Sequence, residues 1–423
     1  MQKSTLRNAM TNKHDERYDL AVIGSGPAGL AGAISAASAG AKVILLEKES
    51  RSGGKIPISG GGRCNLTNIL DAENMARSFG DQWRFLIPAL RSFPPEKLRE
   101  FFDSRDVEIE VTDGFHCFPR SGKAAHIVET LLNECDLLGV RRQNNCKADE
   151  IIFENGRIAG VRAGGRNIFA KALLIASGGR SYPRYCGGTS GYELARQAGH
   201  RITPLFPAMT GVQCVEEWPK LCAGISLPDA ECRIDLPGMK ERCRGELIFT
   251  HSGISAFAVL DLSGRIAELL AEHEIVPLKV NFFAGTSKEE WLQRFQIWQQ
   301  QHGTSNISKL LADFMPKRLI PFFLEQDCSA ARFSAAARRQ TAERLSSYTL
   351  HINAVEGWEK AMVTRGGVDI SEVFPKTMES RLCPGLYFAG EVLAPAGPCG
   401  GYNIQWAFSS GSLAGTSAAQ QMK

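Results

Sequence analysis

The sequence lacks several signatures that define well-known classes of protein. It has 12 cysteines in 423 residues, but they are scattered and no two form a CxxC pair. This pattern argues against a disulfide-stapled secreted scaffold and predicts reduced thiols in a cytoplasmic protein. There is no Walker loop, and no spacing of His, Cys and Asp is typical of a metal site, so no metal is expected. Residues 1–18 carry charges without an apolar core, so no signal peptide is expected.

A strong excess of one charge is also absent. The net charge is +4, which permits an anionic partner without requiring one. Hydrophobic residues make up 43% and charged residues 22%, as in soluble globular proteins, and the length predicts two or three domains.

Leu20–Ala41 has no charge and is long enough to cross a bilayer. Because this stretch is rich in Gly, Ser and Ala, a nucleotide-binding strand, turn and helix explain it better, and no membrane segment is expected.

The N-terminal region carries the first positive motif. Tyr18–Gly24 reads as a buried strand, and Gly24-Ser25-Gly26-Pro27-Ala28-Gly29 reads as a glycine turn that opens a helix. The helix runs to about Ala39, Gly40 is its expected C-cap, and Ala41–Glu47 reads as a second parallel strand. Strand, GxGxxG, helix, strand and acidic residue together form the dinucleotide-binding βαβ fingerprint.

Each residue type in this fingerprint has a physical role. Gly24 permits the tight turn, Gly26 lets the backbone approach a pyrophosphate, and Gly29 allows the helix to pack closely on the strand. N–H groups at the helix start favour phosphate, and Glu47 can accept hydrogen bonds from ribose hydroxyls. The alternative is a glycine turn without a ligand, which the acid at the end of the second strand disfavours. Cofactor contacts are expected from Gly24, Gly26, Pro27, Ala28, Gly29, Glu47 and Lys48.

The fingerprint does not distinguish FAD from NAD, but residues 149–179 bear on that choice. Asp149–Arg162 alternates around Asn155-Gly156, a strong hairpin signal. A third strand is expected at Asn167–Ala170, and Lys171–Gly179 reads as a further apolar strand that enters a glycine turn. A meander between Rossmann strands resembles the arrangement in FAD-binding folds.

The C-terminal region repeats the strand-and-helix theme. Pro384–Glu391 reads as a buried strand that ends in Gly-Glu, and Gly400–Asn403 opens a helix of small and apolar residues from Ile404 to about Ala414. Such a helix start can aim its N–H groups at a flavin carbonyl. Glu391 resembles the acid that binds the ribityl chain in FAD proteins. An ordinary strand–helix connection is the alternative.

These patterns predict an α/β fold class. We expect a Rossmann-like two-layer FAD-binding domain, discontinuous in sequence, with an inserted β-barrel-like domain and a nested helical subdomain. Trp291, Phe295 and Trp298, spaced by four and three residues, predict the helical part. The expected boundaries are 17–204 and 365–423 for the FAD-binding domain, 205–285 and 347–364 for the barrel-like domain, and 286–346 for the helical insert.

Further segments carry a resemblance to a known family. These are Gly54–Asn68 with its GGGRCN block, Gly179–Pro183, Phe249–Ser255, Pro375–Ser380 and the GGYN block at 400–403. They resemble the BaiN/RdsA family of NAD(P)/FAD-dependent oxidoreductases, formerly described as aminoacetone oxidase-like flavoproteins, over nearly the whole chain. The resemblance implies FAD as cofactor and NAD(P)H as electron donor. No second GxGxxG is present, so this donor would bind without its own Rossmann fingerprint. It also implies reduction of conjugated double bonds in steroid-type substrates or of uridine in large-subunit ribosomal RNA.

The resemblance also implies the remaining site residues. Gly60–Gly62 frees the backbone for close approach to the cofactor, and Arg63 could pair with a phosphate or a carboxylate. Cys64 is the first candidate for a catalytic thiol, Cys399 is the second, and a buried structural role is the alternative for a cysteine. The departures from the family pattern at Ala256-Phe257 and Leu393–Gly397 weaken the assignment of the substrate. Further cofactor contacts are expected from Lys55, Gly61, Gly62, Arg63, Ser177, Gly178, Gly390, Glu391, Gly400, Gly401, Tyr402, Asn403 and Ile404.

Basic and titratable residues outside these motifs have less specific interpretations. His116 and His251 could act as acids or bases, but hydrogen-bonded structural roles are expected for both. The predicted helical insert holds Lys317, Arg318, Arg332, Arg338, Arg339 and Arg344, which could contact RNA phosphates or form a solvated helical face.

Three functions are compatible with the sequence. The favoured one is reduction of a conjugated C=C bond, in which hydride is added to the β-carbon of an α,β-unsaturated carbonyl. Cys64 or Cys399 would supply the proton. Arg63, or N–H groups near Gly401 and Tyr402, would hold the carbonyl oxygen. The mild basicity favours ribosomal uridine over a steroid-type enone as the substrate. A flavin oxidase of a small amine and an RNA-binding factor with structural FAD are the alternatives. No CxxxxC dithiol follows Glu47, so disulfide reduction is not expected. No sequence signal indicates the oligomeric state.

Overall fold

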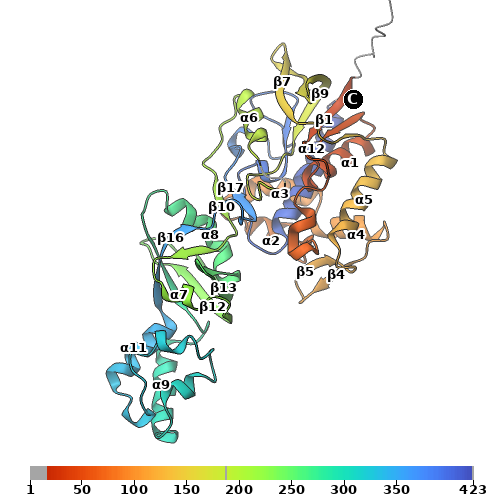
Figure 1. Ribbon diagram of the computed structural model, residues 1–423. Helices are drawn as coiled ribbons and strands as arrows, with labels where there is room; N and C mark the ends of the chain where they lie inside the picture. Colours follow the sequence, from red (N-terminus) through yellow and green to blue (C-terminus); the bar gives the residue numbers. More distant parts are fainter. Residues whose placement is uncertain (1–16, 186–187, 422–423) are drawn as a thin grey trace, which may run out of the picture. The chain divides into compact units, whose positions relative to one another are not determined.

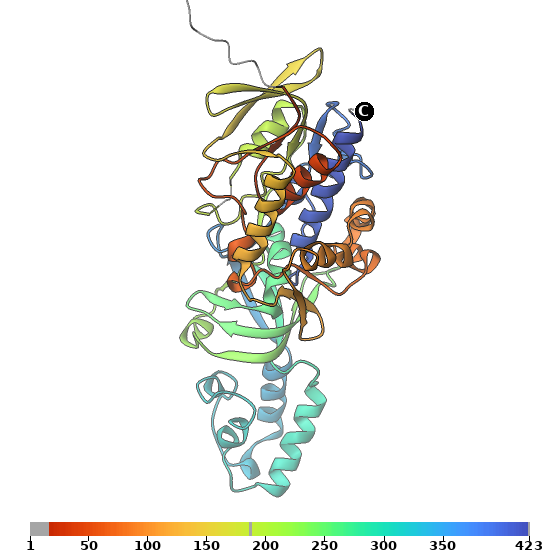
Figure 2. The same ribbon diagram turned by 90° about the vertical axis from the view of Figure 1, so that its right-hand side faces the viewer.

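The chain builds one unit from both of its ends and a second unit from its middle. Figures 1 and 2 show the computed structural model, which describes residues 17–185 and 188–421. The first unit contains the residues up to Leu205 and those from Gly366 onward, and the second runs from Phe206 to Arg365. The predicted boundaries lie one residue before each of these crossings. The predicted fold class, a discontinuous Rossmann-like domain with an inserted barrel and helical segment, is confirmed.

A parallel sheet lies at the centre of the first unit. Its strands follow the order β6-β2-β1-β9-β18. Their bounds are Tyr18–Ile23 for β1, Val43–Leu46 for β2, Arg141–Gln143 for β6, Arg166–Ile175 for β9 and Leu386–Phe388 for β18. All four residues of β2 are buried, and so are all residues of β1 except Asp19, as parallel strands covered on both faces require. The last strand of the sheet therefore comes from the far end of the sequence.

A β-meander is attached to this sheet through β9. Strands β7 (Ala148–Glu154) and β8 (Arg157–Ala163) form the predicted hairpin, and Asn155 and Gly156 at its tip have φ angles of 51° and 73°. Positive φ at both turn residues is the requirement of a type I′ turn. The prediction of two separate strands at 167–170 and from Lys171 is wrong, because β9 is continuous. No Gly or Pro interrupts this strand. Its first part pairs with β8, and its second part pairs with β1 and β18.

Two helices pack against each other beside the sheet. Helix α1 (Pro27–Ser38) and helix α12 (Tyr402–Gln420) lie side by side in both views (Figures 1 and 2). A Cβ atom on Gly411 would lie 2.1 Å from the Ala28 carbonyl oxygen, so only glycine permits this approach. Helix α12 extends six residues past its predicted end, and Gly415 does not stop it: a Cβ there would lie 2.1 Å from the Gly32 carbonyl oxygen, so this glycine allows close packing against α1.

The other elements of the first unit surround this core. The strands are β3 (Thr67–Asn68), β4 (Ile109–Thr112) and β5 (His116–Pro119), in the order β3-β5-β4. The helices are α2 (Ala72–Arg77), α3 (Trp83–Ser92), α4 (Pro95–Asp103), α5 (Ala124–Leu137) and α6 (Ser190–Gln197). No helix among the described residues has the length and hydrophobicity needed to cross a bilayer.

The second unit contains a closed barrel. Its strands follow the order β11-β14-β13-β12-β15-β16. The strands of this unit are β10 (Phe206–Ala208), β11 (Val212–Cys214), β12 (Ser226–Ile234), β13 (Arg242–Phe249), β14 (Gly253–Ser255), β15 (Val276–Asn281), β16 (Tyr348–Val355) and β17 (Val363–Arg365). Two helices accompany the barrel, α7 (Trp218–Leu221) and α8 (Phe257–Leu269). Inward side chains alternate along β15, where Val276, Leu278 and Val280 are buried, as expected for a strand with one face in the core.

A helical insert lies between β15 and β16. It contains α9 (Lys288–Gln301), α10 (Ile307–Leu311) and α11 (Ala335–Ser346). Ser287 and Glu290 form a capping box at the start of α9, and the predicted apolar face of Trp291, Phe295 and Trp298 is buried. The insert shares a core with the barrel, since Trp218 stacks on Phe322 with ring centroids 5.2 Å apart.

Candidate functional site

The glycine turn between β1 and α1 has room for a ligand. Gly24 has a φ of 98°, and a Cβ on Gly29 would lie 1.8 Å from the Gly24 carbonyl oxygen, so both positions require glycine. A Cβ on Gly26 would meet no atom within 4 Å. Helix α1 begins at Pro27, and no side chain caps its first N–H groups. The turn therefore presents open space and helical N–H groups, the arrangement that binds phosphate.

Glu47 fixes this turn from the end of β2. Its Oε2 atom accepts hydrogen bonds from Ser25 N (2.8 Å) and Ser25 Oγ (2.6 Å), and its Oε1 accepts one from Glu49 N (2.9 Å). The residue is buried. Each carboxylate oxygen has more than one acceptor site, so the predicted bonds to ribose hydroxyls are compatible with these contacts. Lys48, the next residue, pairs at the surface with Glu49 at 3.6 Å.

Lys55 and Glu391 connect the two ends of the first unit. Lys55 Nζ lies 2.5 Å from Glu391 Oε2 and 2.5 Å from Ser181 Oγ, and Ser181 Oγ donates to Glu391 Oε1 at 3.1 Å. The side chains of Lys55 and Glu391 are each 19% exposed. The sequence predicted Lys55 and Glu391 as separate cofactor contacts. It gave no role to Ser181, although this residue lies in a motif that carried the family resemblance.

Two glycines and two unpartnered hydroxyls line the neighbouring turns. Gly390, at a φ of 75°, packs against Ala28, because a Cβ there would lie 2.8 Å from the Ala28 Cβ. Gly178 has a φ of 73°. The hydroxyls of Ser177 and Tyr192 are buried and have no hydrogen-bond partner among the described residues. Burial raises the pKa of Tyr192, and the nearby Glu391 carboxylate raises it further. Unpartnered buried hydroxyls are costly, which favours a ligand as their partner.

The glycine loop 60–62 is exposed and lies over an aromatic ring. Gly60, Gly61 and Gly62 have φ angles of 54°, 67° and 87°. A Cβ on Gly60 would lie 3.0 Å from the Phe118 ring, whereas one on Gly61 would meet nothing within 4 Å. The Arg63 guanidinium is centred 4.5 Å from the Phe118 ring centroid. The loop and Arg63 therefore form an open, donor-bearing surface above β5.

The two candidate thiols differ in access. Cys64 is 0% exposed, and burial raises the pKa of its thiol to about 12, while a hydrogen bond with Ser59 opposes the rise. This thiol stays protonated at neutral pH but presents no surface. Cys399 is partly exposed and directly precedes Gly400. Of the two, Cys399 is the thiol that a substrate can reach in this conformation.

The start of α12 is held close to the glycine loop. Gly401, its N-cap residue, has a φ of 85°, and no side chain caps the helix. Asn68 Nδ2 donates to the Gly400 carbonyl oxygen at 2.8 Å, and Asn65, with its amide oriented to satisfy both neighbours, accepts from Gly401 N at 3.2 Å. Because Asn65 lies three residues after Gly62, this bond ties the segment that follows the loop to the helix start.

Three predicted cofactor contacts, Tyr402, Asn403 and Ile404, lie in the first turn of α12. Asn403 binds Gly397 through two hydrogen bonds of 2.8 Å and 3.0 Å, so its amide holds the 393–397 loop. Tyr402 is buried, and its ring lies 6.4 Å from that of Phe79. Ile404 is partly exposed in the first turn of α12. The predicted contacts of Tyr402, Asn403 and Ile404 with the cofactor stay predictions.

The two histidines differ from each other. His116 lies beside Gly400: a Cβ on Gly400 would be 3.3 Å from its Nε2 atom. Its Nδ1 atom lies 2.8 Å from Asp113 Oδ2. The expected hydrogen bond of His116 is therefore confirmed, but its position at the site was not predicted. His251, in the second unit, is exposed and has no hydrogen bond among the described residues, so the structural role expected for it is wrong.

The residues of the first unit fit FAD. The open cradle at Gly26, the uncapped starts of α1 and α12, and the unpartnered Ser177 hydroxyl are suited to a dinucleotide and a flavin ring. The part of the chain that the structure describes holds no group of three or more His, Cys, Asp or Glu side chains that could bind a metal ion.

Comparisons with known proteins show which family the chain belongs to. Residues 18–417 match the family described as HI0933-like protein Rossmann domain. The chain is 30% identical over 410 residues to the 3-dehydro-bile acid delta(4,6)-reductase of Clostridium scindens, covering 95% of this chain and 99% of the relative. It is 30% identical over 405 residues to the ribosomal RNA dihydrouridine synthase of Escherichia coli, covering 93% and 96%.

Solved structures share the fold. A flavocytochrome c3 fumarate reductase matches with a TM-score of 0.54 at 16% identity, over 96% of this chain and 78% of that one. The 3-ketosteroid delta1-dehydrogenase of Sterolibacterium denitrificans matches with a TM-score of 0.52 at 12% identity, over 96% and 100%. Fold, site and full-length similarity together define an FAD-dependent oxidoreductase. The chain belongs to the HI0933-like family.

Proposed function

We propose that this protein reduces a carbon–carbon double bond conjugated to a carbonyl group, and that its substrate is a uridine of large-subunit ribosomal RNA. NAD(P)H is the proposed electron donor. Two relatives of nearly the same length support this reaction class, because both names describe it: a delta(4,6)-reductase of a 3-dehydro-bile acid and a synthase of dihydrouridine. An oxo group conjugated to a C=C bond is the unit that both substrates contain.

The reaction needs a hydride, a proton and a donor at oxygen. FAD, when bound and reduced, supplies the hydride to the β-carbon, which is C6 of uracil. The π electrons move to the carbonyl oxygen, giving an enolate, and the α-carbon C5 then takes a proton. The C=C bond is reduced by two electrons, and the flavin is oxidised by the same two. The protein must bind the oxygen as charge develops and deliver the proton.

One observation carries the proposal: the glycine loop 60–62 and the uncapped start of α12 are tied together by the Asn65–Gly401 hydrogen bond. The loop is exposed, and Arg63 extends over Phe118 beside it. This arrangement offers the exposed guanidinium of Arg63 to an enolate oxygen. Of the two predicted thiols, Cys64 is buried and Cys399 is partly exposed.

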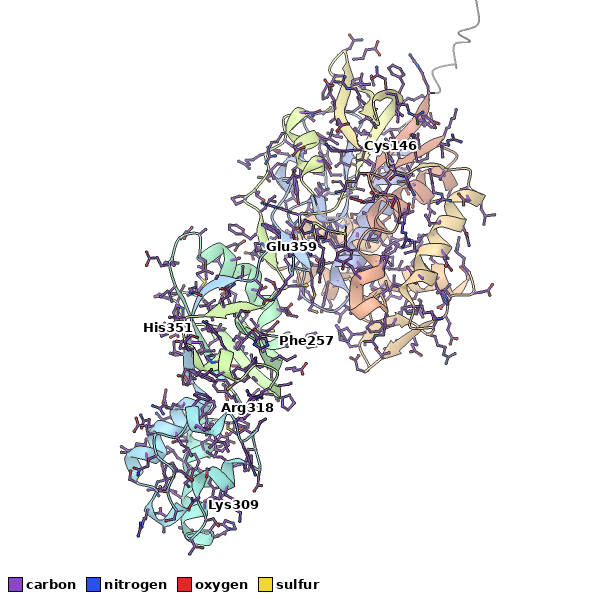
Figure 3. The ribbon with its side chains drawn as sticks, in the orientation of Figure 1. Cys146, Phe257, Lys309, Arg318, His351 and Glu359 are labelled. Carbon is purple, nitrogen blue, oxygen red and sulfur yellow. The ribbon has the colours of Figure 1, made fainter. Side chains whose placement is uncertain are left out.

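Exposed cations on the helical insert support RNA over a small enone. Lys309, Lys317, Arg332 and Arg339 are exposed and form no ion pair or side-chain hydrogen bond among the described residues. Figure 3 labels Lys309 and Arg318 on this insert. Unpaired cations of this kind contact phosphates, and a small neutral enone would not use them. The other arginines are engaged, Arg338 with Gln299 and Arg344 with Glu325.

A deletion strain tests the proposed function. Large-subunit ribosomal RNA from a strain without this gene should lose dihydrouridine at one position, as measured by mass spectrometry of RNA fragments. The wild-type gene should restore the modification, and the Gly26→Val variant, expected to lose FAD, should not. RNA that keeps all its dihydrouridine would rule out the RNA substrate. Turnover of a conjugated 3-oxo steroid by the purified enzyme would then make the small enone the substrate.

A further inference from the structure

Strand β5 directs two side chains at the glycine-rich surface of the proposed site. Side chains alternate along a strand, so His116 and Phe118 lie on one face of β5 and Cys117 on the other. Phe118 lies beneath Gly60 and the Arg63 guanidinium, and the His116 and Phe118 rings are 6.4 Å apart. The imidazole is therefore next to the surface that is proposed to hold the substrate oxygen.

The imidazole has a defined orientation. Its Nδ1 atom lies 2.8 Å from Asp113 Oδ2 and 3.1 Å from Oδ1, and Asp113 Oδ1 also accepts the N–H groups of His116 (3.1 Å) and Phe115 (3.2 Å). The backbone N–H of His116 is the main cause that lowers the pKa of Asp113, so this carboxylate is ionised at neutral pH. An ionised acceptor fixes a proton on Nδ1 and leaves Nε2 as the outward atom.

The second ring nitrogen of His116, Nε2, lies beside Gly400. A Cβ on Gly400 would come within 3.3 Å of His116 Nε2, and that residue lies between Cys399 and the N-cap Gly401. The ring of Phe115 packs edge-on against the imidazole, with ring centroids 5.0 Å apart. The His116 side chain is 26% exposed, whereas Cys64 is 0% exposed. The imidazole is therefore accessible at the glycine surface, whereas the Cys64 thiol is not.

We propose that His116, held by Asp113, donates the proton to the α-carbon of the substrate. The assignment rests on the proposed function. The imidazolium Nε2–H bond breaks and leaves its electron pair on nitrogen. The C=C electrons of the enolate form the new C–H bond at the α-carbon, and the oxygen lone pair forms the C=O bond again. The neutral imidazole then takes a proton from water. The two electrons come from reduced FAD through the β-carbon, so the histidine changes only its protonation. Asp113 is a positioning residue that stays ionised and supports the imidazolium.

The experiment separates the two half-reactions of the purified holoenzyme. Under anaerobic conditions, NAD(P)H should bleach the flavin of wild type and His116→Gln at similar rates. Reoxidation of the reduced enzyme by a uridine-containing ribosomal RNA fragment, or by 2-cyclohexenone as a small probe, should fall by roughly a hundredfold or more in His116→Gln, the scale for loss of a general acid. Added imidazole should restore part of the rate. His126→Gln, on the partly exposed side of α5, is the matched control and should behave as wild type.

A purely structural role would give a different pattern. Asp113→Asn should lower the maximal rate of reoxidation with little change in the substrate concentration at half-maximal rate, while FAD content stays that of wild type. If His116→Gln retains FAD and is reoxidised at the wild-type rate, the assignment of His116 is wrong and a thiol or water is the donor. If the wild-type enzyme itself is reoxidised by neither probe, the proposed function fails and the assignment fails with it.

Discussion

Lys55 Nζ donates to both oxygens of Glu391, at 2.5 Å and 2.7 Å, although 336 residues separate the two in sequence. The contact joins the segment after the N-terminal βαβ unit to the segment after the last strand of the sheet. A cofactor that lies beside this ion pair would contact both of these segments. The ion pair therefore provides the first test of the site.

Replacing Glu391 with Gln should weaken FAD binding. The amide keeps the shape of the side chain but removes the charge that positions Lys55, so we expect Kd to rise about tenfold, or about 1.4 kcal/mol. Fluorescence of released FAD during dialysis measures this change. Glu154→Gln, at the exposed tip of the β7–β8 hairpin, is the control and should bind FAD as wild type does. An unchanged Kd in Glu391→Gln would remove Glu391 from the cofactor site.

Two glycines of the same turn should respond in opposite ways to alanine. A Cβ on Gly26 meets nothing within 4 Å, so Gly26→Ala should keep the apoprotein's Tm and lose FAD affinity. A Cβ on Gly29 would lie 1.8 Å from the Gly24 carbonyl oxygen, so Gly29→Ala should lower the Tm of the apoprotein itself. Differential scanning fluorimetry of apo and FAD-loaded protein separates the effects. A Gly26→Ala protein with wild-type FAD affinity would place the pyrophosphate elsewhere.

Stability should fall at high pH because several thiols are buried. Burial raises the pKa of Cys64, Cys135 and Cys214 to about 12. The unfolded chain loses these protons near pH 9, so the folded state is favoured fully below that pH and loses this advantage as the pH rises toward 12. Each thiol should lower the free energy of unfolding by up to about 1.4 kcal/mol per pH unit in this window.

Urea unfolding between pH 8 and pH 11 measures this dependence. Cys64→Ala should show a shallower decline than wild type, because it has one buried thiol fewer. Identical slopes for the two proteins would show that Cys64 is accessible in solution, and would restore it as a reachable catalytic thiol.

The cations of the helical insert should affect RNA binding alone. The triple substitution of Lys317, Arg332 and Arg339 by Ala should weaken binding of ribosomal RNA. The slope of log affinity against log salt should also become shallower, by roughly one for each phosphate that the variant no longer binds. Reduction of a small enone should keep its wild-type rate. Arg162→Ala, on β8, serves as the control. An unchanged salt slope in the triple variant would show that the insert does not bind RNA.

The sequence predicted those parts of the fold that depend on local chemistry. The glycine turn, the Asn155-Gly156 hairpin and the apolar face of α9 follow from turn residues and periodicity, which short segments carry by themselves. The continuity of β9 was missed because it depends on which strands pair with each half. The inserted barrel-like domain was predicted without its strand order.

The contacts within the site were largely beyond sequence reasoning. Ser181 meets Lys55, and His116 meets Gly400, only because distant segments approach each other in the folded chain. The burial of Cys64 had the same cause: the GGGRCN motif placed this thiol near the cofactor, but packing turned it inward. An Asp three residues before a His within a short turn was the one local signal for the Asp113–His116 pair, and a hydrogen-bonded structural role explained it equally well.

Anaerobic reoxidation of the reduced holoenzyme is the decisive measurement for the proposed reduction of ribosomal uridine. The enzyme is reduced with one equivalent of NAD(P)H and mixed with unmodified large-subunit ribosomal RNA, and flavin absorbance and dihydrouridine are followed together. We predict that the oxidised flavin spectrum returns as one dihydrouridine forms for each FAD. Flavin that stays reduced with the RNA and with a conjugated enone, but reoxidises in air with release of peroxide, would contradict the proposed reaction and indicate an oxidase.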